Sequence, residues 1–471
     1  MLRNASAGVI GVSGRNPHYY QYKGKELLLI TSAEHYGAVI NKAFDYIRYF
    51  DALAEYGLNY TRIYPGAVVE PQGSWLSEDM LSPDAENLIL PWARSEIPGY
   101  IGGGNKFDLS RWDPDYFFRL RDFMKEALFR DIIVEICFFN CQNKPYWEYC
   151  PLHCNANIQG VGDCDHIAFQ TLDNEPLVKE QLRFIEKIMV ETNEFDNVIY
   201  EFVDEPTLML TPSHKAYHWI ERQVEKAIEV EDALPKRHLL AQQLEIGVDF
   251  APDDRVAVIV TQYLQLNSRQ VGGMAALDSC YAYNKPIELN ETAYVPSWYD
   301  RDHEDISRLE AWEFMIGGGA AFNQLNGYFQ ASDPSGDNEV NRKLLAGLKN
   351  LRTFMESFDY VKMTRNAKDV LKTSVGANIN CIAEKGRQYA LYMHHSLANQ
   401  GRFRGTFYEP AYGEYETVVT LKLEKGRYKV AYVEPKTLNV LSESYITSDG
   451  GPVELACPRY TLDVAIKITA G

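Results

Sequence analysis

The sequence of 471 residues contains no apolar run long enough to cross a membrane, so we expect no membrane-spanning helix. Positive charge is scarce, because 47 Lys and Arg residues face 65 Asp and Glu residues, for a formal charge of −18. This balance argues against nucleic acid, an anionic membrane surface or a polyanionic substrate as the main partner. The first eight residues lack the pattern of a secretory signal. We therefore expect a cytoplasmic protein, or an exported one whose signal is absent here.

The eight cysteines form no Cys-x-x-Cys motif, although five of them lie between residues 137 and 164. His153 and His166 lie among or just after those five. Because the spacings match no standard zinc pattern, we expect buried or loop thiols. A structural zinc ion, or one or two disulfides in an exported protein, are the alternatives.

What the sequence does contain is a repeated alternation of strand and helix patterns. Eight such alternations over about 340 residues predict an α/β fold, a (β/α)8 TIM barrel over residues 1–360 that opens with a β-hairpin at 18–30. The predicted strands end near residues 30, 63, 139, 203, 244, 261, 289 and 326. Residues 65–112 and 140–174 are long loops, which usually form rims or lids. Residues 361–471 predict a C-terminal antiparallel β-sandwich, because short strands there alternate with Gly, Pro and Asn turns.

Two carboxylates follow the fourth predicted strand. Asp204 and Glu205 come directly after the run at 198–203, and Pro206 has no N–H to continue the ladder. In a parallel barrel the βα loops meet at the carboxyl ends of the strands, where active sites lie. The alternative is that Asp204 caps the next helix, with Glu205 and Pro206 in its first turn.

A second glutamate stands in the same situation after the seventh strand, where Asn290 and Glu291 end the apolar run at 287–289. Two strand-end glutamates are what a retaining glycosidase needs. One exchanges a proton with the glycosidic oxygen and the other attacks the anomeric carbon, with the carboxyls roughly 5–5.5 Å apart. We therefore expect Glu205 and Glu291 to face one cavity of a closed sheet.

With these motifs the chain resembles the clan A glycoside hydrolases, whose fourth strand typically ends in Asn-Glu-Pro. Residues 200–206 are YEFVDEP. The resemblance implies that Glu205 is the acid/base and Glu291 the nucleophile. It also implies that Arg62 matches the arginine of the second strand and that Tyr263 hydrogen-bonds the nucleophile. Residues 426–468 resemble the small C-terminal domain of apiosidase-like and cellulase-like bacterial members.

Asp204 departs from the clan pattern, which usually has Asn at this position. An ionised aspartate can only accept hydrogen bonds, so the contact with the sugar differs. Its charge would also raise the pKa of Glu205, which suits an acid that must be protonated near neutral pH. Glu201 faces the same side of the strand, and we expect it to be a buried barrel residue.

The residues predict a retaining β-glycoside hydrolase that cleaves a plant or microbial oligo- or polysaccharide, with carbohydrate as its partner and no metal or organic cofactor. Arg62 next to the carboxylates would keep Glu291 ionised. Asn140, His35 and Trp298 are further candidates for sugar contacts. Two alternatives stay open: a barrel that binds carbohydrate without turnover, and a metal-dependent hydrolase that uses the Cys and His residues of 141–166.

Overall fold

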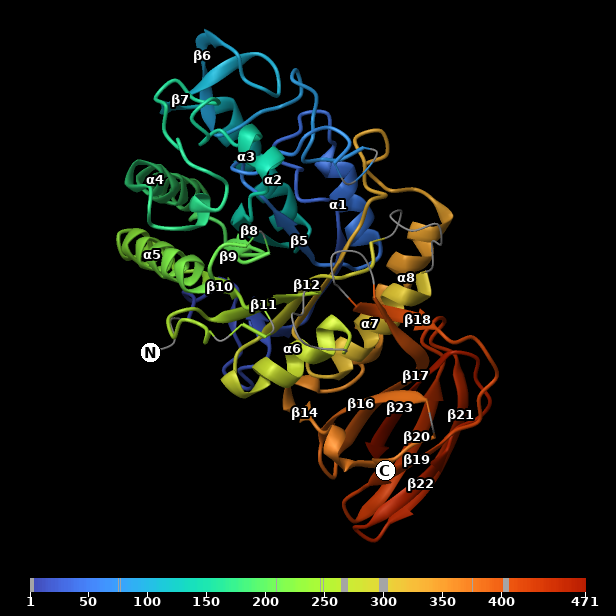
Figure 1. Cartoon of the computed structure of the whole chain (residues 1–471). Helices are drawn as coiled ribbons and strands as arrows, with labels where there is room; N and C mark the ends of the chain where they lie inside the picture. Colours follow the sequence, from blue (N-terminus) through green and yellow to red (C-terminus); the bar gives the residue numbers. More distant parts are fainter. Residues whose placement is uncertain are drawn as a thin grey trace.

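The structure is a computed structural model that describes residues 4–471 except 75, 77, 209, 246, 249, 264–269, 296–303, 375 and 401–405, and the side chain of Gln400. Its central feature is a sheet of eight parallel strands in the order β4-β13-β12-β11-β10-β9-β8-β5 (Figure 1). The strands are β4 (Leu29–Ala33), β5 (Tyr60–Ile63), β8 (Ile133–Asn140), β9 (Val198–Asp204), β10 (Leu239–Gln243), β11 (Val258–Gln262), β12 (Ile287–Glu291) and β13 (Ala321–Leu325). All eight were predicted from the sequence, and the (β/α)8 fold is confirmed.

Asn59 joins the first and last strands of this order. Its backbone N–H donates to the Ile30 carbonyl at 3.3 Å, and its side-chain oxygen accepts from the Ile30 N–H at 3.0 Å. Its carbonyl accepts from the Ile133 N–H at 2.9 Å. One residue therefore bridges β4, β5 and β8, so that the sheet is nearly closed and the carboxyl ends of its strands form a ring.

Helices cover the outside of the barrel (Figure 1). They are α1 (Tyr46–Glu55), α2 (Pro114–Phe129), α4 (Glu175–Thr192), α5 (Ser213–Asp232), α6 (Gly272–Cys280), α7 (Glu304–Ile316) and α8 (Glu339–Glu356). The Asp113 carboxylate caps α2 by accepting from the N–H groups of Asp115 and Tyr116, as the Asp-Pro start predicts. In the described part of the chain, no helix combines the length and the apolar character needed to span a membrane.

Asp204 is not a helix cap. It is the last residue of β9, and α5 begins only at Ser213, after a loop. The cap alternative fails because Glu205 has a left-handed backbone, with φ +51°, which interrupts any helical turn at this point.

The two long loops contain elements that the sequence pattern does not predict. The first holds an antiparallel pair, β6 (Trp92–Pro98) and β7 (Asn105–Trp112), and the second holds α3 (Lys144–Tyr149). Short 3-10 turns are η1 (Ala168–Gln170), η2 (Tyr281–Tyr283), η3 (Tyr360–Lys362) and η4 (Ala367–Asp369). These loops project from the carboxyl side of the neighbouring strands β5 and β8.

The predicted N-terminal hairpin is present as β2 (Tyr20–Tyr22) and β3 (Lys25–Leu27), with β1 (Gly11–Val12) beside it. Lys23 and Gly24 both have positive φ, as the tight turn between paired strands requires. Val12 and Tyr20 pack in one apolar cluster with Leu29, the first residue of β4. The hairpin thus covers the amino end of the barrel and leaves the carboxyl end for function.

The C-terminal region contains a seven-stranded and a three-stranded antiparallel sheet around a common core. The strands are β14 (Thr364–Arg365), β15 (Val370–Lys372), β16 (Ala377–Glu384), β17 (Gln388–Gln400), β18 (Thr406–Pro410), β19 (Val418–Lys422), β20 (Gly426–Val433), β21 (Val440–Ser448), β22 (Pro452–Ala456) and β23 (Asp463–Ala470). Arg308 on α7 donates to Asp463 on β23 at 2.9 and 3.1 Å, so a buried ion pair ties the sheets to the barrel.

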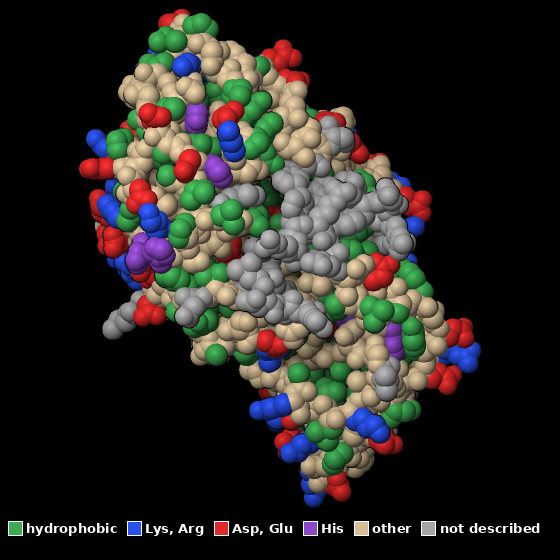
Figure 2. Space-filling view, in the orientation of Figure 1, with side chains coloured by type: hydrophobic (Ala, Val, Ile, Leu, Met, Phe, Trp, Pro, Cys, Tyr) green, Lys and Arg blue, Asp and Glu red, His purple; other side chains and the backbone are tan. Residues whose placement is uncertain are grey.

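The face drawn in Figure 2 carries acidic and basic side chains in a mixed pattern over its described surface, without a continuous basic patch among them. This distribution agrees with the formal charge of −18 and offers no obvious footprint for a polyanion on this face.

Candidate active site

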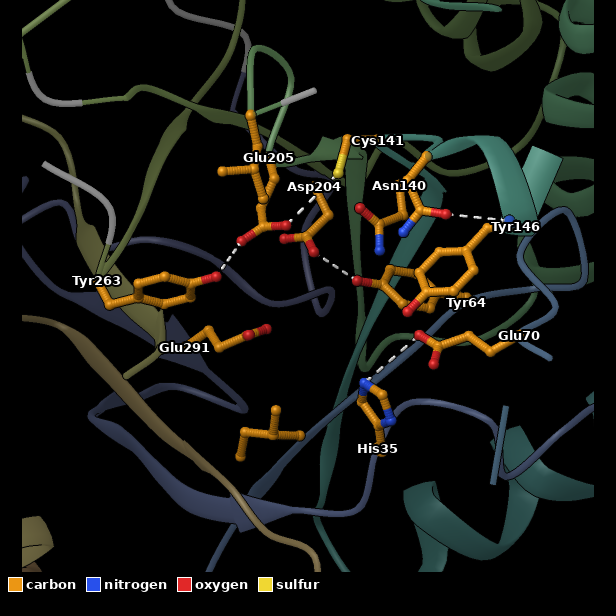
Figure 3. A pocket seen from close by; sticks show the side chains of 13 residues that line it. His35, Tyr64, Glu70, Asn140, Cys141, Tyr146, Asp204, Glu205, Tyr263 and Glu291 are labelled. Atoms are coloured by element: carbon orange, nitrogen blue, oxygen red, sulfur yellow. Dashed lines mark hydrogen bonds and ion pairs between the residues drawn. The ribbon is translucent and has the colours of Figure 1, made fainter. Parts of the chain in front are cut away.

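A pocket opens at the carboxyl ends of the barrel strands, and we call it the barrel-mouth pocket (Figure 3). The space between its lining side chains is about 550 Å³, a figure that includes open solvent at the mouth. Its lining comprises His35, Tyr64, Glu70, Asn140, Cys141, Asn143, Tyr146, Asp204, Glu205, Leu208, Tyr263, Glu291 and Leu325. Four of these side chains are carboxylic acids, so the pocket is acidic.

Glu205 enters the pocket from the end of β9. Its left-handed φ of +51° costs on the order of 1 kcal/mol, and the Gln243 side chain holds this conformation by accepting from the Glu205 N–H at 2.8 Å. The Tyr263 hydroxyl donates to Glu205 Oε1 at 2.5 Å, and the Cys141 thiol lies 3.5 Å from Oε2. Both carboxylate oxygens are therefore oriented by neighbouring side chains.

The environment of Glu205 favours its protonated form. Burial and then the charge of Asp204 raise the pKa of Glu205 to about 8, while the hydrogen bonds from Tyr263 and Cys141 act in the opposite direction. Glu205 as a whole is only 7% exposed. The balance of these influences favours the protonated form of Glu205 near neutral pH.

Glu291 enters from the end of β12 and has different partners. The Tyr36 hydroxyl donates to Glu291 Oε2 at 3.1 Å, and Arg62 Nη1 lies 3.9 Å from the same oxygen. Burial, followed by the charges of Asp204 and Glu205, raises the pKa of Glu291, while Arg62 and Tyr36 lower it. A proton on Glu205 removes one of the charges that oppose ionisation of Glu291.

Asp204 lies beside both glutamates and is fully engaged by the protein. Its Oδ1 accepts from Arg62 Nη2 at 2.7 Å and from the Gln262 amide, and its Oδ2 accepts from the Tyr64 hydroxyl at 2.6 Å. The Arg62 side chain is wholly buried and also donates to Glu201 at 2.8 Å. Glu201 is thus the buried barrel residue that its strand position predicted.

Most of the residues singled out in the sequence meet in this pocket. His35, Asn140 and Tyr263 line it together with the three strand-end acids, and Arg62 lies directly beneath. Trp298 lies outside the described residues.

One expected contact is different. Tyr263 donates to Glu205, and it is Tyr36 that donates to Glu291. The β11–β12 register shifts between Thr261 and Gln262, directly before Tyr263, and such irregularities re-aim side chains. Tyr36 is aimed by its own left-handed backbone, with φ +53°.

Sequence reasoning missed several pocket residues. Tyr64 comes directly after β5, and Asp204 ends β9. The place of Tyr64 at a strand end could therefore have identified it as a pocket residue. Cys141 likewise follows β8. Glu70 and Tyr146 come from the long loops, where no periodic pattern predicts which side chains turn inward.

Among the described residues, one group of three or more His, Cys, Asp and Glu side chains is spaced to hold a metal ion. It is His35, Glu70 and Asp79, all buried. Burial, followed by the charge of Asp79, raises the pKa of Glu70 well above its usual range. The described residues include all eight cysteines, which are unpaired, and the Cys-rich loop at 141–166 forms no such group.

No family model matches the chain, and no curated protein matches it. Solved structures do. A glycoside hydrolase family 5 protein from Bacteroides vulgatus aligns with 98% of this chain and 94% of its own, at a TM-score of 0.62 and 10% identity. A second B. vulgatus structure aligns with 98% of this chain and 82% of its own, at a TM-score of 0.62 and 14% identity. A third structure, named glycoside hydrolase, aligns with 98% of this chain and 97% of its own, at a TM-score of 0.61 and 10% identity. At these identities the similarity establishes the fold of the whole chain, barrel and β-sheets together.

Proposed function

We propose that the protein is a retaining glycoside hydrolase in which Glu291 is the nucleophile and Glu205 the acid/base. One observation carries the proposal. Two glutamates from the carboxyl ends of β9 and β12 line one pocket, and each is held by the hydroxyl of a different tyrosine. The names of two solved structures with the same fold support glycoside hydrolysis as the reaction.

The first step is attack by a Glu291 oxygen on the anomeric carbon while Glu205 gives its proton to the departing glycosidic oxygen. A covalent glycosyl-enzyme results. In the second step the ionised Glu205 takes a proton from water, the water oxygen attacks the anomeric carbon, and the bond to Glu291 breaks. Two inversions leave the sugar with its original configuration.

The charges around the pocket support these roles. Glu205 has a pKa of about 8 and lacks a cationic partner among the described residues, as a proton donor at neutral pH requires. Arg62 and the Tyr36 hydroxyl both favour the ionised form of Glu291, as a nucleophile requires. Burial and the neighbouring carboxylates raise the pKa of both glutamates, but Arg62 gives Glu291 a nearby positive charge that Glu205 does not have among the described residues.

The proposed substrate is a plant or microbial oligo- or polysaccharide. Tyr146 and Tyr263 line the pocket with aromatic rings on which a sugar can pack. The side-chain oxygen of Asn140 has no partner among the described residues and can accept from a sugar hydroxyl. Residues 426–468 resemble the small C-terminal domain of apiosidase-like and cellulase-like bacterial members of clan A, and we extend the proposal to that group.

The test is hydrolysis of a panel of aryl glycosides, with the anomeric form of the first product followed by NMR. We expect retention, and Glu291→Gln should lower kcat by on the order of 1,000-fold or more. The matched control is Glu231→Gln. Glu231 is a buried acid next to His238, at the amino end of β10, away from the pocket. An inverted product, or full activity in Glu291→Gln, would contradict the mechanism. Sugar binding without any hydrolysis would indicate a lectin-like barrel instead.

A further inference from the structure

One wall of the barrel-mouth pocket carries ionisable side chains that have no task in the proposed hydrolysis. His35 and Glu70 line the pocket, and Asp79 lies behind them. The three are 8%, 3% and 5% exposed, and their ligand atoms lie within 4.8 Å of one another. His35 follows β4, whereas the two acids come from the loop after β5, so the fold brings them together.

The two carboxylates are incompletely satisfied. Glu70 Oε2 and Asp79 Oδ2 are buried and accept no hydrogen bond from another described residue, although a proton on Glu70 can be shared with Asp79. No described lysine or arginine forms an ion pair with either acid, and their ionic neighbour is the His35 ring. Buried carboxylates are costly unless they are protonated, paired with a cation or bound to a metal.

The His35 ring lies between the two acids. Its Nδ1 is 2.8 Å from Asp79 Oδ1. Its Nε2 is 3.9 Å from Glu70 Oε1, and Figure 3 joins this pair by a dashed line. An imidazole binds an ion through one nitrogen, so only Nδ1 and Asp79 Oδ1, 2.8 Å apart, are already spaced as neighbouring ligands, because bonds of ~2.0–2.2 Å place adjacent ligand atoms ~2.8–3.6 Å apart. Glu70 completes the set from within 4.8 Å, and its carboxylate would move toward the ion on binding. The 2.8 Å distance equally suits a hydrogen bond from the imidazole, so the arrangement has two explanations.

We propose that His35, Glu70 and Asp79 bind one divalent transition-metal ion of the Zn²⁺ type at the wall of the barrel-mouth pocket. One imidazole and two carboxylates form a ligand set that such ions accept, whereas Ca²⁺ and Mg²⁺ prefer oxygen ligands alone. Three protein ligands leave a coordination position for water or for an oxygen atom of a bound ligand. The site differs from the metal-free protein expected from the sequence, and also from the Cys-rich loop that it suggested as an alternative.

The test is metal binding by the full-length protein without substrate. Protein freed of metal by a chelator is titrated with Zn²⁺ by calorimetry, and the metal retained after desalting is measured by mass spectrometry. We expect one Zn²⁺ per chain. Glu70→Gln and Asp79→Asn, each shown to be folded by circular dichroism, should weaken binding at least about 10-fold. Glu231→Gln, which alters the separate buried pair with His238, should bind as the unmodified protein does.

Co²⁺ identifies the ligands independently. We expect visible d–d absorption without a thiolate-to-cobalt charge-transfer band, and loss of the d–d bands in Asp79→Asn. A charge-transfer band would locate the ion at cysteines and overturn the proposal. So would the absence of stoichiometric Zn²⁺ binding, tighter binding of Ca²⁺, or unchanged affinity in both variants, and the hydrogen-bonded His35–Asp79 pair would then be the correct explanation. Because no readout involves hydrolysis, failure here is distinct from failure of the proposed function.

Discussion

The hydroxyl of Tyr263 donates a 2.5 Å hydrogen bond to Oε1 of Glu205. Through this bond a residue that follows β11 orients a carboxyl that follows β9. The same bond favours the ionised form of Glu205 and thus opposes burial and the Asp204 charge, which together raise its pKa to about 8. The balance among these influences sets the pH at which Glu205 loses its proton, and two substitutions change it in opposite directions.

Tyr263→Phe should move the alkaline limb of the kcat/KM profile to higher pH. The change removes a donor that stabilises ionised Glu205, so the pKa of Glu205 rises, by on the order of one unit. The rate at the optimum should fall about 10- to 100-fold, because the carboxyl loses its orienting contact. A profile measured with an aryl glycoside checks this, and a shift to lower pH would contradict the assignment of Glu205 as the acid.

Asp204→Asn should move the same limb to lower pH. The charge of Asp204 raises the pKa of both Glu205 and Glu291, so its removal lowers both pKa values. The acid limb of the kcat/KM profile should therefore move to lower pH as well. The Asn side chain can still accept from Arg62 or Tyr64 through its single oxygen. A binding titration with the substrate sugar, run alongside, separates lost affinity from altered ionisation. Identical pH profiles in the variant and the unmodified protein would contradict the claim that the Asp204 charge raises these pKa values.

Glu310 on α7 should make folding stability decrease with rising pH. Burial and the neighbouring Glu313 raise the pKa of Glu310 to about 8 in the folded protein, from 4.5 in the unfolded chain. Between these pH values the folded state holds a proton that the unfolded state has released. The contribution of Glu310 to the free energy of unfolding is therefore fully present below pH 4.5 and is lost as the pH rises toward 8. The loss is at most about 1.4 kcal/mol per pH unit for each such group. Urea midpoints at pH 5, 6.5 and 8 should show a smaller slope in Glu310→Gln.

Arg308→Met should destabilise the protein without changing the chemistry in the pocket. Removing one partner of a buried ion pair leaves Asp463 buried without its counter-charge, which costs about 3–5 kcal/mol. Thermal unfolding should show a clear fall in the midpoint, with kcat per folded molecule unchanged. As the control, Lys343→Met removes the exposed pair with Glu339 and should leave the midpoint where it is. Equal midpoints in the two variants would show that the Arg308 pair contributes nothing.

The sequence determined the barrel and the places where its acids stand. Strand and helix patterns are local, since a period of two or of 3.6 residues is set by neighbours along the chain. They therefore placed Asp204, Glu205 and Glu291 at strand ends, and a parallel barrel brings strand ends together. The inward direction of Glu201 followed from the alternation of side chains along its strand. Arg62 was expected near the acids because it lies near the end of the second strand and matches the clan arginine there.

Only the tertiary structure decided the partners of those acids. Tyr263 bonds to Glu205 because of a register shift after Thr261. Tyr36 bonds to Glu291 because its own backbone is left-handed. Neither feature leaves a periodic signal in the sequence. Glu70 and Asp79 lie in a loop without repeating pattern, and their meeting with His35 depends on the path of that loop over the barrel. Local periodicity fixes elements, whereas contacts between loops arise from packing over long sequence separations, and a single sequence does not encode these in any short pattern.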